Sequence, residues 1–245
     1  MKFNLYSQYY DLIYNSKNYS SETKKIADKI SIEKPKILEL GCGSGGHAEE
    51  LSKLNCSITG LDLSDSMVQI ANSKNIPNFR AIKADIVSFE LNQKFDAVIS
   101  MFHVISYLST NEEVLNCFNC VAKHLQSGAP FIFDFWFSPA VFHNGFEHRV
   151  KTFSNDKITV VRESSALLDV NTNTAKVCFD IKVSDNKSDR NENIIEEHKM
   201  RFFSIPEIII FAETSGFEVV EFFDLHSNQE PSLETWAITT KLQKK

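Results

Sequence analysis

Short apolar runs alternate with amphipathic segments along the first half of the chain. The runs are rich in β-branched and aromatic residues, and the segments between them carry apolar residues at helical spacing. Strands that alternate with helices in this way are typical of a parallel sheet covered by helices on both faces. We therefore predict a doubly wound α/β fold with strands at residues 37–40, 57–62, 79–83, 95–100 and 130–134.

The periodicity changes after the fifth predicted strand. Residues 157–168 and 175–183 alternate apolar with polar positions, and a polar turn at 169–173 joins them, which is typical of antiparallel strands. We predict an antiparallel β insertion of three or four strands, with a solvated hairpin tip at 185–193. A seven-stranded, mostly parallel sheet is then completed by a helix at 206–215 and an antiparallel pair at 217–225 and 233–241.

Tyrosines are concentrated ahead of the first strand, at positions 6, 9, 10, 14 and 19. Ser20-Ser21-Glu22 is a helix-start signal, and the helix that it predicts continues to Ile30. Phenol groups at this density favour a helical lid over a bound ligand, and packing of any one of them against the sheet is an equal alternative. Two further helices are predicted after Ser64 and Ser109.

A glycine-rich loop, Gly41-Cys42-Gly43-Ser44-Gly45-Gly46, joins the first strand to the following helix. Glycine at such a turn lets a ligand approach the main chain closely. Asp62 follows the loop by about twenty residues, where the end of a second parallel strand places a carboxylate beside the ribose hydroxyls of a nucleoside. The stretch predicts a nucleoside-binding half-site, but its glycines also fit the dinucleotide fingerprint and do not choose a cofactor alone.

Three features favour S-adenosylmethionine. Glu39 stands two residues before the first glycine, and a carboxylate there suits a cationic methionyl group better than a pyrophosphate. About 35 residues precede the first strand, whereas a dinucleotide domain usually begins close to it. Asp85 ends the third strand, where a carboxylate can accept from an adenine amino group. The combination resembles the class I S-adenosylmethionine-dependent methyltransferases, whose core is Rossmann-like.

That resemblance divides the chain into three parts. Residues 1–33 are expected to form the helical lid, residues 34–140 and 204–245 the Rossmann-like core that binds S-adenosylmethionine, and residues 141–203 the antiparallel insertion on the acceptor side.

Composition limits the kinds of molecule that the protein is expected to bind. The net charge of −6 argues against nucleic acid, because that binding depends on a basic surface. We find neither a signal-peptide core nor eighteen consecutive apolar residues, so we expect a cytoplasmic protein that does not bind membranes. Cys117 and Cys120 fall in a predicted helix without further ligands, so we expect no metal site. The expected partner is a small-molecule substrate, and a homodimer is compatible with the sequence.

Four segments resemble a narrower family. They are Tyr10-Asp11-Leu12-Ile13-Tyr14, the glycine loop ending at His47, Ser100-Met101-Phe102 with Tyr107-Leu108, and Asp134-Phe135-Trp136-Phe137. Over nearly the whole chain they look like the N,N-dimethyltransferases of 3-amino-deoxysugar nucleotides. The resemblance implies in-line transfer of a methyl group from S-adenosylmethionine to the amino group of an aminodeoxysugar.

The resemblance also implies roles for individual residues. Tyr19 would hold the methionyl carboxylate, Asp62 the ribose and Asp85 the adenine amino group. The expected cofactor site consists of Tyr19, Glu39, Gly41, Cys42, Gly43, His47, Asp62, Leu63, Met67, Asp85, Ile86, Met101 and Phe102. The expected substrate site consists of Tyr10, Tyr14, Tyr107, Asp134, Trp136, Phe137 and His143.

One departure from that family concerns the acceptor. The family has Pro-Ser-Gly-Arg-Gly near the C-terminus, and its arginine suits a nucleotide diphosphate, whereas this chain has Pro231-Ser232-Leu233-Glu234-Thr235-Trp236. A glutamate repels a diphosphate, so the nucleotide part of the acceptor stays open. One alternative is an O-methyltransferase of a sugar hydroxyl, a phosphate or a phosphoramidate in surface-glycan biosynthesis. An alternative of another class is a NAD-dependent oxidoreductase.

The need for a general base depends on the acceptor. An amine needs only to be neutral and aligned, whereas a hydroxyl benefits from a base. His103 is the first catalytic candidate, because it directly follows the fourth strand and imidazole titrates near neutral pH. A histidine that caps a buried turn is the alternative interpretation. Tyr107 and Tyr14 are the further catalytic candidates.

Overall fold

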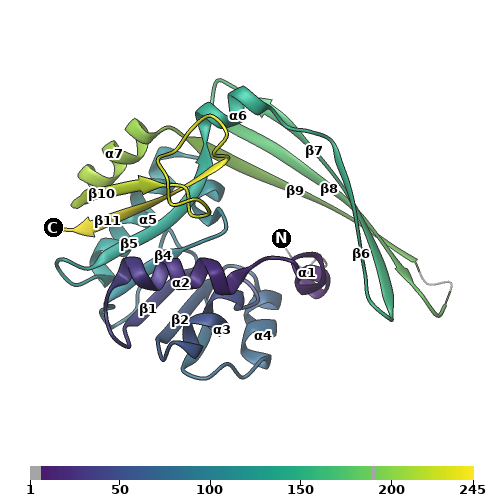
Figure 1. Cartoon of the computed structure of the whole chain (residues 1–245), viewed down its shortest axis with the longest axis horizontal. Helices are drawn as coiled ribbons and strands as arrows, with labels where there is room; N and C mark the ends of the chain where they lie inside the picture. The colour runs from purple at the N-terminus through teal and green to yellow at the C-terminus, as the bar shows by residue number, and fades with distance from the viewer. Residues whose placement is uncertain (1–6, 189–190) are drawn as a thin grey trace.

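A layered core and a group of long strands that extends from it make up the computed structural model, which describes residues 7–188 and 191–245 (Figure 1). Tyr6 of the predicted lid lies outside the described residues. The helices are α1 (Ser7–Ile13), α2 (Tyr19–Ile30), α3 (Gly46–Lys53), α4 (Asp65–Ser73), the 3₁₀ helix η1 (Val104–Tyr107), α5 (Asn111–His124), α6 (Ser138–Asn144) and α7 (Ile205–Thr214). The core strands are β1 (Lys36–Leu40), β2 (Ser57–Asp62), β3 (Phe79–Lys83), β4 (Ala97–Ser100), β5 (Pro130–Phe137), β10 (Phe217–Phe223) and β11 (Ala237–Lys244).

The core sheet has the strand order β3-β2-β1-β4-β5-β11-β10. Strands β1 to β5 pair in parallel, and β11 runs antiparallel between β5 and β10. Helices α5 and α7 pack against one face through residues such as Phe118 and Phe211, and α2 and α3 pack against the other through Ile26 and Leu51. The predicted doubly wound, seven-stranded fold is therefore confirmed.

Hydrogen-bonding side chains set where the helices begin. Ser64 caps α4 by accepting from the backbone N–H of Met67, as predicted. Helix α5 begins one residue later than predicted, because Thr110 rather than Ser109 forms a capping box with Glu113. Helix α2 begins earlier than the Ser20 signal indicated, because the Asn18 side chain accepts from the N–H of Ser21 at 3.0 Å.

Four antiparallel strands form the insertion: β6 (Arg149–Ser154), β7 (Ile158–Asp169), β8 (Thr174–Asp185) and β9 (Asn191–Phe203). Strand β9 also joins the end of β5 in parallel, with Trp136 paired to Phe202. In Figure 1 the long strands arch away from the core and α1 lies beneath them. Apolar residues of α1, including Ile13, pack against Val160 and Ile181 of the insertion, so the lid and the insertion form one wall.

Four local predictions need correction. Strand β4 begins at Ala97 rather than Phe95, because Phe95 instead forms an isolated bridge with Leu125. Helix α6, with a proline in its first turn, was not predicted and contains the expected start of the insertion. The hairpin tip is shorter than 185–193, since β8 ends at Asp185 and β9 begins at Asn191; residues 189–190 lie outside the described residues. The last strand begins at Ala237 rather than Leu233.

Candidate active site

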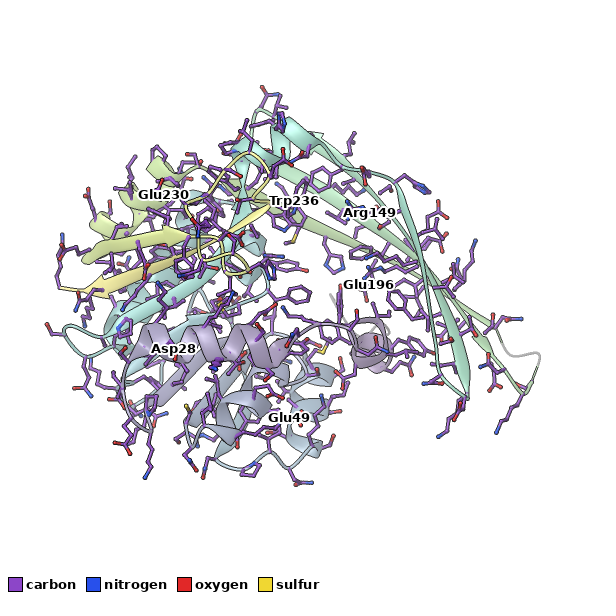
Figure 2. The ribbon with its side chains drawn as sticks, in the orientation of Figure 1. Asp28, Glu49, Arg149, Glu196, Glu230 and Trp236 are labelled. Atoms are coloured by element: carbon purple, nitrogen blue, oxygen red, sulfur yellow. The ribbon has the colours of Figure 1, made fainter. Side chains whose placement is uncertain are left out.

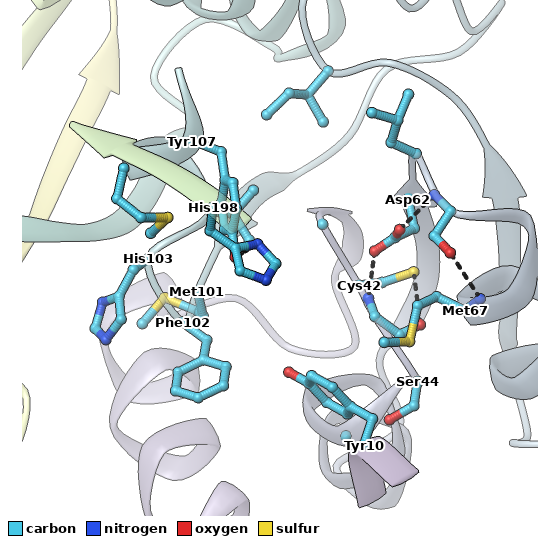
Figure 3. Close-up of a pocket in the computed structure, with 18 of the residues that line it drawn as sticks. Tyr10, Cys42, Ser44, Asp62, Met67, Met101, Phe102, His103, Tyr107 and His198 are labelled. Carbon is cyan, nitrogen blue, oxygen red and sulfur yellow. Dashed lines mark hydrogen bonds between the residues drawn. The ribbon is translucent and has the colours of Figure 1, made fainter. Parts of the chain in front are cut away.

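A cavity of about 600 Å³ lies at the carboxyl ends of β1, β2 and β4, between the core, α1 and the insertion (Figure 3). Open α/β sheets bind their ligands at this edge. The glycine loop and Asp62 line one side, and Tyr14, Tyr107 and Trp136 line another. The cavity therefore brings together segments from the lid, the core and the insertion.

The glycine loop is shaped by close contacts on its outer side. A Cβ on Gly41, whose φ is +68°, would lie 2.4 Å from Val104 Cγ2, and one on Gly46 would lie 2.7 Å from the Tyr19 ring. At Gly43 no atom lies within 4 Å of the Cβ position. The main chain at Gly43 is thus open to a ligand, which is the arrangement expected where a cofactor lies against bare backbone.

Asp62, the last residue of β2, is held by two main-chain N–H groups. Its Oδ2 accepts from Gly43 at 2.8 Å and its Oδ1 accepts from Ser64 at 2.9 Å. Burial raises the pKa of this carboxyl and outweighs the main-chain hydrogen bonds, which lower it. A carboxylate oxygen has two lone-pair sites, so each oxygen retains acceptor capacity for a ribose diol.

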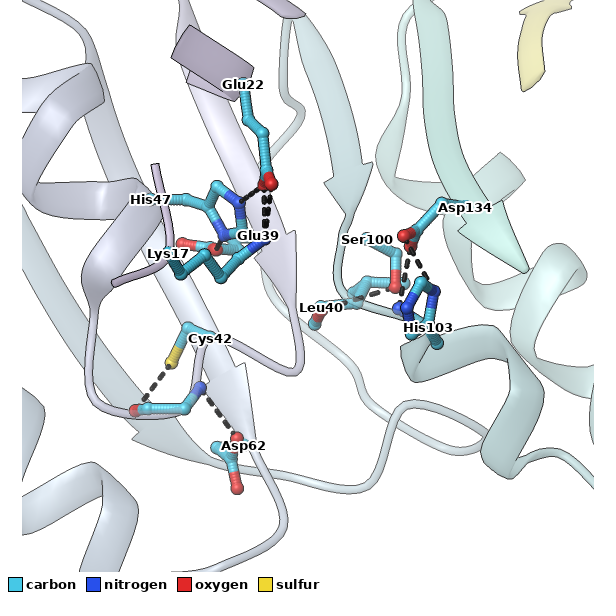
Figure 4. A network of polar contacts seen from close by, with 11 residues as sticks. Lys17, Glu22, Glu39, Leu40, Cys42, His47, Asp62, Ser100, His103 and Asp134 are labelled. Atoms are coloured by element: carbon cyan, nitrogen blue, oxygen red, sulfur yellow. Dashed lines mark hydrogen bonds and ion pairs between the residues drawn. The ribbon is translucent and has the colours of Figure 1, made fainter. Parts of the chain in front are cut away.

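Beneath the loop, His47 lies between two carboxylates (Figure 4). Its Nε2 is 3.0 Å from Glu22 Oε2 and its Nδ1 is 3.5 Å from Glu39 Oε1. Burial lowers the pKa of His47, whereas the contacts with the two carboxylates raise it by a larger amount. The pKa of His47 is therefore raised overall. For Glu22, burial is outweighed by hydrogen bonds from His47 and Lys17, which lower its pKa to about 2. The network fixes α2 of the lid to β1 and α3 of the core.

Glu39 does not line the cavity, contrary to its expected place in the cofactor site. Its side chain is buried and turned toward His47, and within residues 7–188 and 191–245 its Oε2 has no hydrogen-bond partner. The other expected cofactor residues all line the cavity: Tyr19, Gly41, Cys42, Gly43, His47, Asp62, Leu63, Met67, Asp85, Ile86, Met101 and Phe102.

The segment after β4 has a strained backbone. Phe102 and His103 have φ values of +67° and +65°, a region that bulky residues rarely occupy. Asp134 holds this conformation: its Oδ1 accepts from the His103 N–H at 2.8 Å, and its Oδ2 is 2.9 Å from His103 Nδ1. His103 lines the cavity while Asp134 lies behind it, so Asp134 acts on the site through His103.

The expected substrate residues separate into two sets. Tyr10, Tyr14, Tyr107 and Trp136 line the cavity. Phe137 is buried in the pairing of β5 with β9, and His143 lies on the exposed side of α6, 3.7 Å from Glu234. Neither lines the cavity, and the unpredicted helix α6 explains the position of His143.

Sequence reasoning expected the insertion on the acceptor side but named none of the strand residues that it contributes to the cavity. His198 lines the cavity, and its Nδ1 lies 3.3 Å from the Tyr107 hydroxyl. Glu196 lies on the same strand and on the side of the insertion that faces the core (Figure 2). The available signal was the period of two along β9, which places His198 on the same face as Ile194, Met200 and Phe202. The cavity residues contributed by the insertion are Val177, Phe179, His198 and Met200.

The described residues show two further absences. Within residues 7–188 and 191–245, no helix is both long and apolar enough to cross a membrane. In the same residues, no group of three or more His, Cys, Asp or Glu side chains is arranged to hold a metal ion.

Comparisons with known proteins show the family of the chain. A family model described as a methyltransferase domain matches residues 37–128. The chain is 32% identical over 177 residues to dTDP-3-amino-3,4,6-trideoxy-α-D-glucopyranose N,N-dimethyltransferase of Streptomyces venezuelae, which covers 70% of this chain and 74% of that protein.

Solved structures share the fold. The crystal structure of Streptomyces venezuelae DesVI has a TM-score of 0.81 at 24% identity and covers 98% of both chains. The S-adenosylmethionine-bound structure of CalS10, an amino pentose methyltransferase from Micromonospora echinaspora, has a TM-score of 0.77 at 19% identity and covers 100% of this chain and 98% of that one.

Proposed function

The chain belongs to the class I S-adenosylmethionine-dependent methyltransferases, and we propose that its acceptor is the amino group of an aminodeoxysugar carried on a nucleotide. The activity and the methyl donor follow from the family. The dinucleotide alternative gains no support from the matches. The acceptor is supported by what the relative of known activity acts on and by the aromatic and polar residues across the cavity from Asp62.

The residues of one wall fit the donor. Gly43 offers open main chain, and Asp62 has acceptor capacity on both carboxylate oxygens for the ribose diol. Leu63 and Met67 would enclose the adenine, Asp85 would accept from its amino group, and Tyr19 would hold the methionyl carboxylate. When bound, S-adenosylmethionine supplies a methyl group on a positively charged sulfur, which is already a good leaving group.

The chain mainly has to align the acceptor and keep water out. In-line transfer gains most from holding the two reactants in one geometry. The Tyr10 and Tyr14 rings contact each other at a tilt, with centroids 4.7 Å apart, and Phe102 meets the Tyr14 ring edge-on at 5.1 Å. These rings roof the cavity, and the Lys17 ammonium lies 4.4 Å from the centre of the Phe102 ring. We propose that this roof excludes water and positions the acceptor nitrogen.

The single observation that carries the proposal is the arrangement of the cavity. A diol-binding carboxylate on β2 and an open glycine backbone lie on one side, and Tyr107 and His198 lie on the other. This arrangement supports a nucleoside donor facing a polar acceptor.

The test is a direct assay. Purified protein is incubated with S-adenosylmethionine and dTDP-3-amino-3,4,6-trideoxyglucose, and the product is followed by mass spectrometry. We expect the mass gain of one or two methyl groups at the amino nitrogen. The same sugar with a hydroxyl in place of the amine should gain none. Methylation of the hydroxyl sugar but not of the amine would overturn the proposal.

O-methylation is the second candidate, because the His103–Asp134 contact of 2.9 Å is the kind of arrangement that orients a general base. Under this candidate, His103→Asn should lower kcat on a hydroxyl acceptor by about a hundredfold or more. On an amine acceptor the same variant should lose little, since alignment alone suffices. A small loss on both acceptors would remove this candidate.

A further inference from the structure

His198 is a buried titratable residue in a row of alternate positions on β9 that also includes Glu192 and Glu196. It stands on the face of β9 that also carries Ile194, Met200 and Phe202, and its side chain is only 1% exposed. Even so, it lines the cavity opposite the glycine loop. Burying a polar group costs free energy unless it is paired, so an imidazole here needs an explanation beyond packing.

The two imidazole nitrogens of His198 have different surroundings: Nδ1 makes a hydrogen bond, whereas Nε2 faces a carboxylate without the alignment of a hydrogen bond. Nε2 lies 3.3 Å from Glu196 Oε2, and Nδ1 lies 3.3 Å from the Tyr107 hydroxyl. A carboxylate beside one ring nitrogen holds a proton there and leaves the other nitrogen as the acceptor. Glu196 therefore favours the form of His198 in which Nδ1 is basic and faces Tyr107.

Tyr107 connects this pair to the cavity. It lies in η1, which follows β4 directly, and it lines the cavity itself. Burial raises the pKa of the Tyr107 hydroxyl well above its usual value, with smaller contributions from Tyr14, Glu196 and Asp62. The phenol therefore stays neutral, and it can pass a proton on but does not retain a negative charge.

Other charged and titratable groups surround this row. The Tyr14 hydroxyl, in the turn after α1, accepts a hydrogen bond of 3.1 Å from Arg162 on β7, and the Arg162 guanidinium also lies over the ring of Phe179, which in turn contacts the His198 ring. Asp62 on β2 acts on Tyr107 from across the cavity. His103 also lines the cavity, but its ring is turned toward Asp134, away from Cys42 and Asp62 (Figures 3 and 4).

An aminosugar brings a proton that must leave before methyl transfer. Aliphatic amines are largely protonated at neutral pH, and an ammonium has no lone pair for attack on carbon. Under the proposed function, the rings of Tyr10, Tyr14 and Phe102 keep water away from the acceptor. An amine acceptor in this cavity therefore needs a proton acceptor supplied by the chain.

We propose that His198 accepts the proton of the acceptor ammonium through the Tyr107 hydroxyl, and that Glu196 positions the His198 ring. This inference rests on the aminosugar function proposed above. The ammonium N–H gives its proton to the Tyr107 oxygen while Tyr107 O–H gives its own to His198 Nδ1. The freed nitrogen lone pair then forms the bond to the methyl carbon, and the electron pair of the broken carbon–sulfur bond stays on sulfur. The imidazolium is balanced by the Glu196 carboxylate.

The pH dependence of the reaction tests this assignment. The kcat/KM for the aminosugar is measured from about pH 6 to pH 9.5 in the wild type and in His198→Gln. We expect the variant to be about a hundredfold slower at the acidic end and to approach the wild type toward the alkaline end, because a growing fraction of the amine is neutral in solution there. A loss of the same factor at every pH would show that His198 only packs, and would overturn the proposal.

The matched control is His148→Gln. His148 makes a comparable histidine–carboxylate contact, 2.7 Å from Glu163, but both side chains are about half exposed and outside the cavity. Its pH profile should follow that of the wild type.

Tyr107→Phe leaves the ring in place and should reproduce the pH-dependent loss. If His198→Gln fails to fold, a loss of the same factor at every pH in Tyr107→Phe overturns the proposal by itself. A wild type that does not methylate the aminosugar at any pH would instead refute the proposed function.

Discussion

The two walls of the cavity are built in different ways. The proposed donor half consists of the glycine loop at 41–46 with Asp62, Met67 and Asp85, all within one stretch of 45 residues or so. The proposed acceptor half consists of Tyr14, Tyr107, Trp136 and His198, which come from the turn after α1, from η1, from β5 and from β9. The donor half is thus encoded by short-range spacing, whereas the acceptor half exists only once the insertion folds back over the core.

The halves also differ in what fixes their side chains. Main-chain N–H groups hold Asp62 in the donor half. In the acceptor half, side chains hold one another, as Tyr107, His198 and Glu196 do. We infer that substitutions in the donor half abolish cofactor binding, and that those in the acceptor half change the rate, the pH dependence or the acceptor affinity while cofactor binding is retained.

The largest effect is expected in the donor half, from Asp62→Ala. Removal of two charge-assisted hydrogen bonds to the ribose, each contributing about 1.5 to 3 kcal/mol, should weaken S-adenosylmethionine binding by roughly a hundredfold or more, as measured by calorimetry. Asp65→Ala is the control, because Asp65 is an exposed residue at the start of α4 that pairs with Lys83. An affinity of Asp62→Ala equal to that of the control would refute the donor assignment.

The variant Gly41→Ala tests the contact between the glycine loop of the donor half and η1 of the acceptor half. Its Cβ would overlap Val104 of η1 at 2.4 Å, and its φ of +68° disfavours alanine. We expect a loss of about 2 to 4 kcal/mol of unfolding free energy by chemical denaturation.

The double variant Gly41→Ala/Val104→Ala should recover the part of this loss that comes from the overlap. Gly216→Ala, at φ +79° with no atom nearby, should lose only the backbone part, about 1 to 2 kcal/mol. Equal losses in Gly41→Ala and Gly216→Ala would mean that η1 does not press on the loop.

A smaller effect, on stability alone, is expected for the network that ties the lid to the donor half. The pKa of His47 is raised in the folded state, so its stabilisation is fully present below the unfolded pKa of about 6.5 and is lost as the pH rises through the folded value. The pKa of Glu22 is lowered to about 2, so its contribution is present above the unfolded pKa and is lost as the pH falls toward 2.

The comparison is His47→Gln against the wild type in denaturant unfolding. The wild type should be more stable by about 1 to 2 kcal/mol between roughly pH 5 and 6.5, and the difference should shrink at higher pH. A difference that grows as the pH rises would contradict a charged His47.

The smallest effect is expected in the acceptor half, from Tyr14→Phe. The variant keeps the ring contacts with Tyr10 and Phe102 but loses the 3.1 Å hydrogen bond from Arg162. We expect a few-fold higher KM for the acceptor, with S-adenosylmethionine affinity unchanged by calorimetry, because one neutral hydroxyl contributes about 0.5 to 1.5 kcal/mol. A changed affinity for S-adenosylmethionine would contradict the inference that substitutions in the acceptor half leave cofactor binding unchanged.

The sequence predicted the fold around the glycine loop well, because its elements follow one another. The glycine loop and Asp62 could be located from strand ends and spacing, and so could the seven-stranded sheet. The direction of a single side chain could not be: Glu39 lies in a strand buried on both faces, and only the packing of His47 against it turns the carboxylate away from the cavity. A pattern that is apolar on both faces carries no information on which way a residue points.

The acceptor half was predicted only in part for a related reason. Tyr10, Tyr14, Tyr107 and Trp136 could be named from a family resemblance, but Glu196 and His198 interrupt the apolar phase of β9 and read as ordinary polar positions. Their contact with Tyr107 joins residues about ninety positions apart, which no local pattern specifies. His143 was misplaced because the helix after β5 had no clear signal beyond one proline.

The most direct test of the account is a crystal structure with S-adenosylhomocysteine and dTDP-3-amino-3,4,6-trideoxyglucose bound together. We predict the ribose on Asp62, main-chain contact at Gly43, and the sugar nitrogen within hydrogen-bond distance of the Tyr107 hydroxyl, on the side of the cavity that His198 lines. A sugar nitrogen directed away from Tyr107, or a nucleoside that leaves Asp62 without contact, would contradict the account.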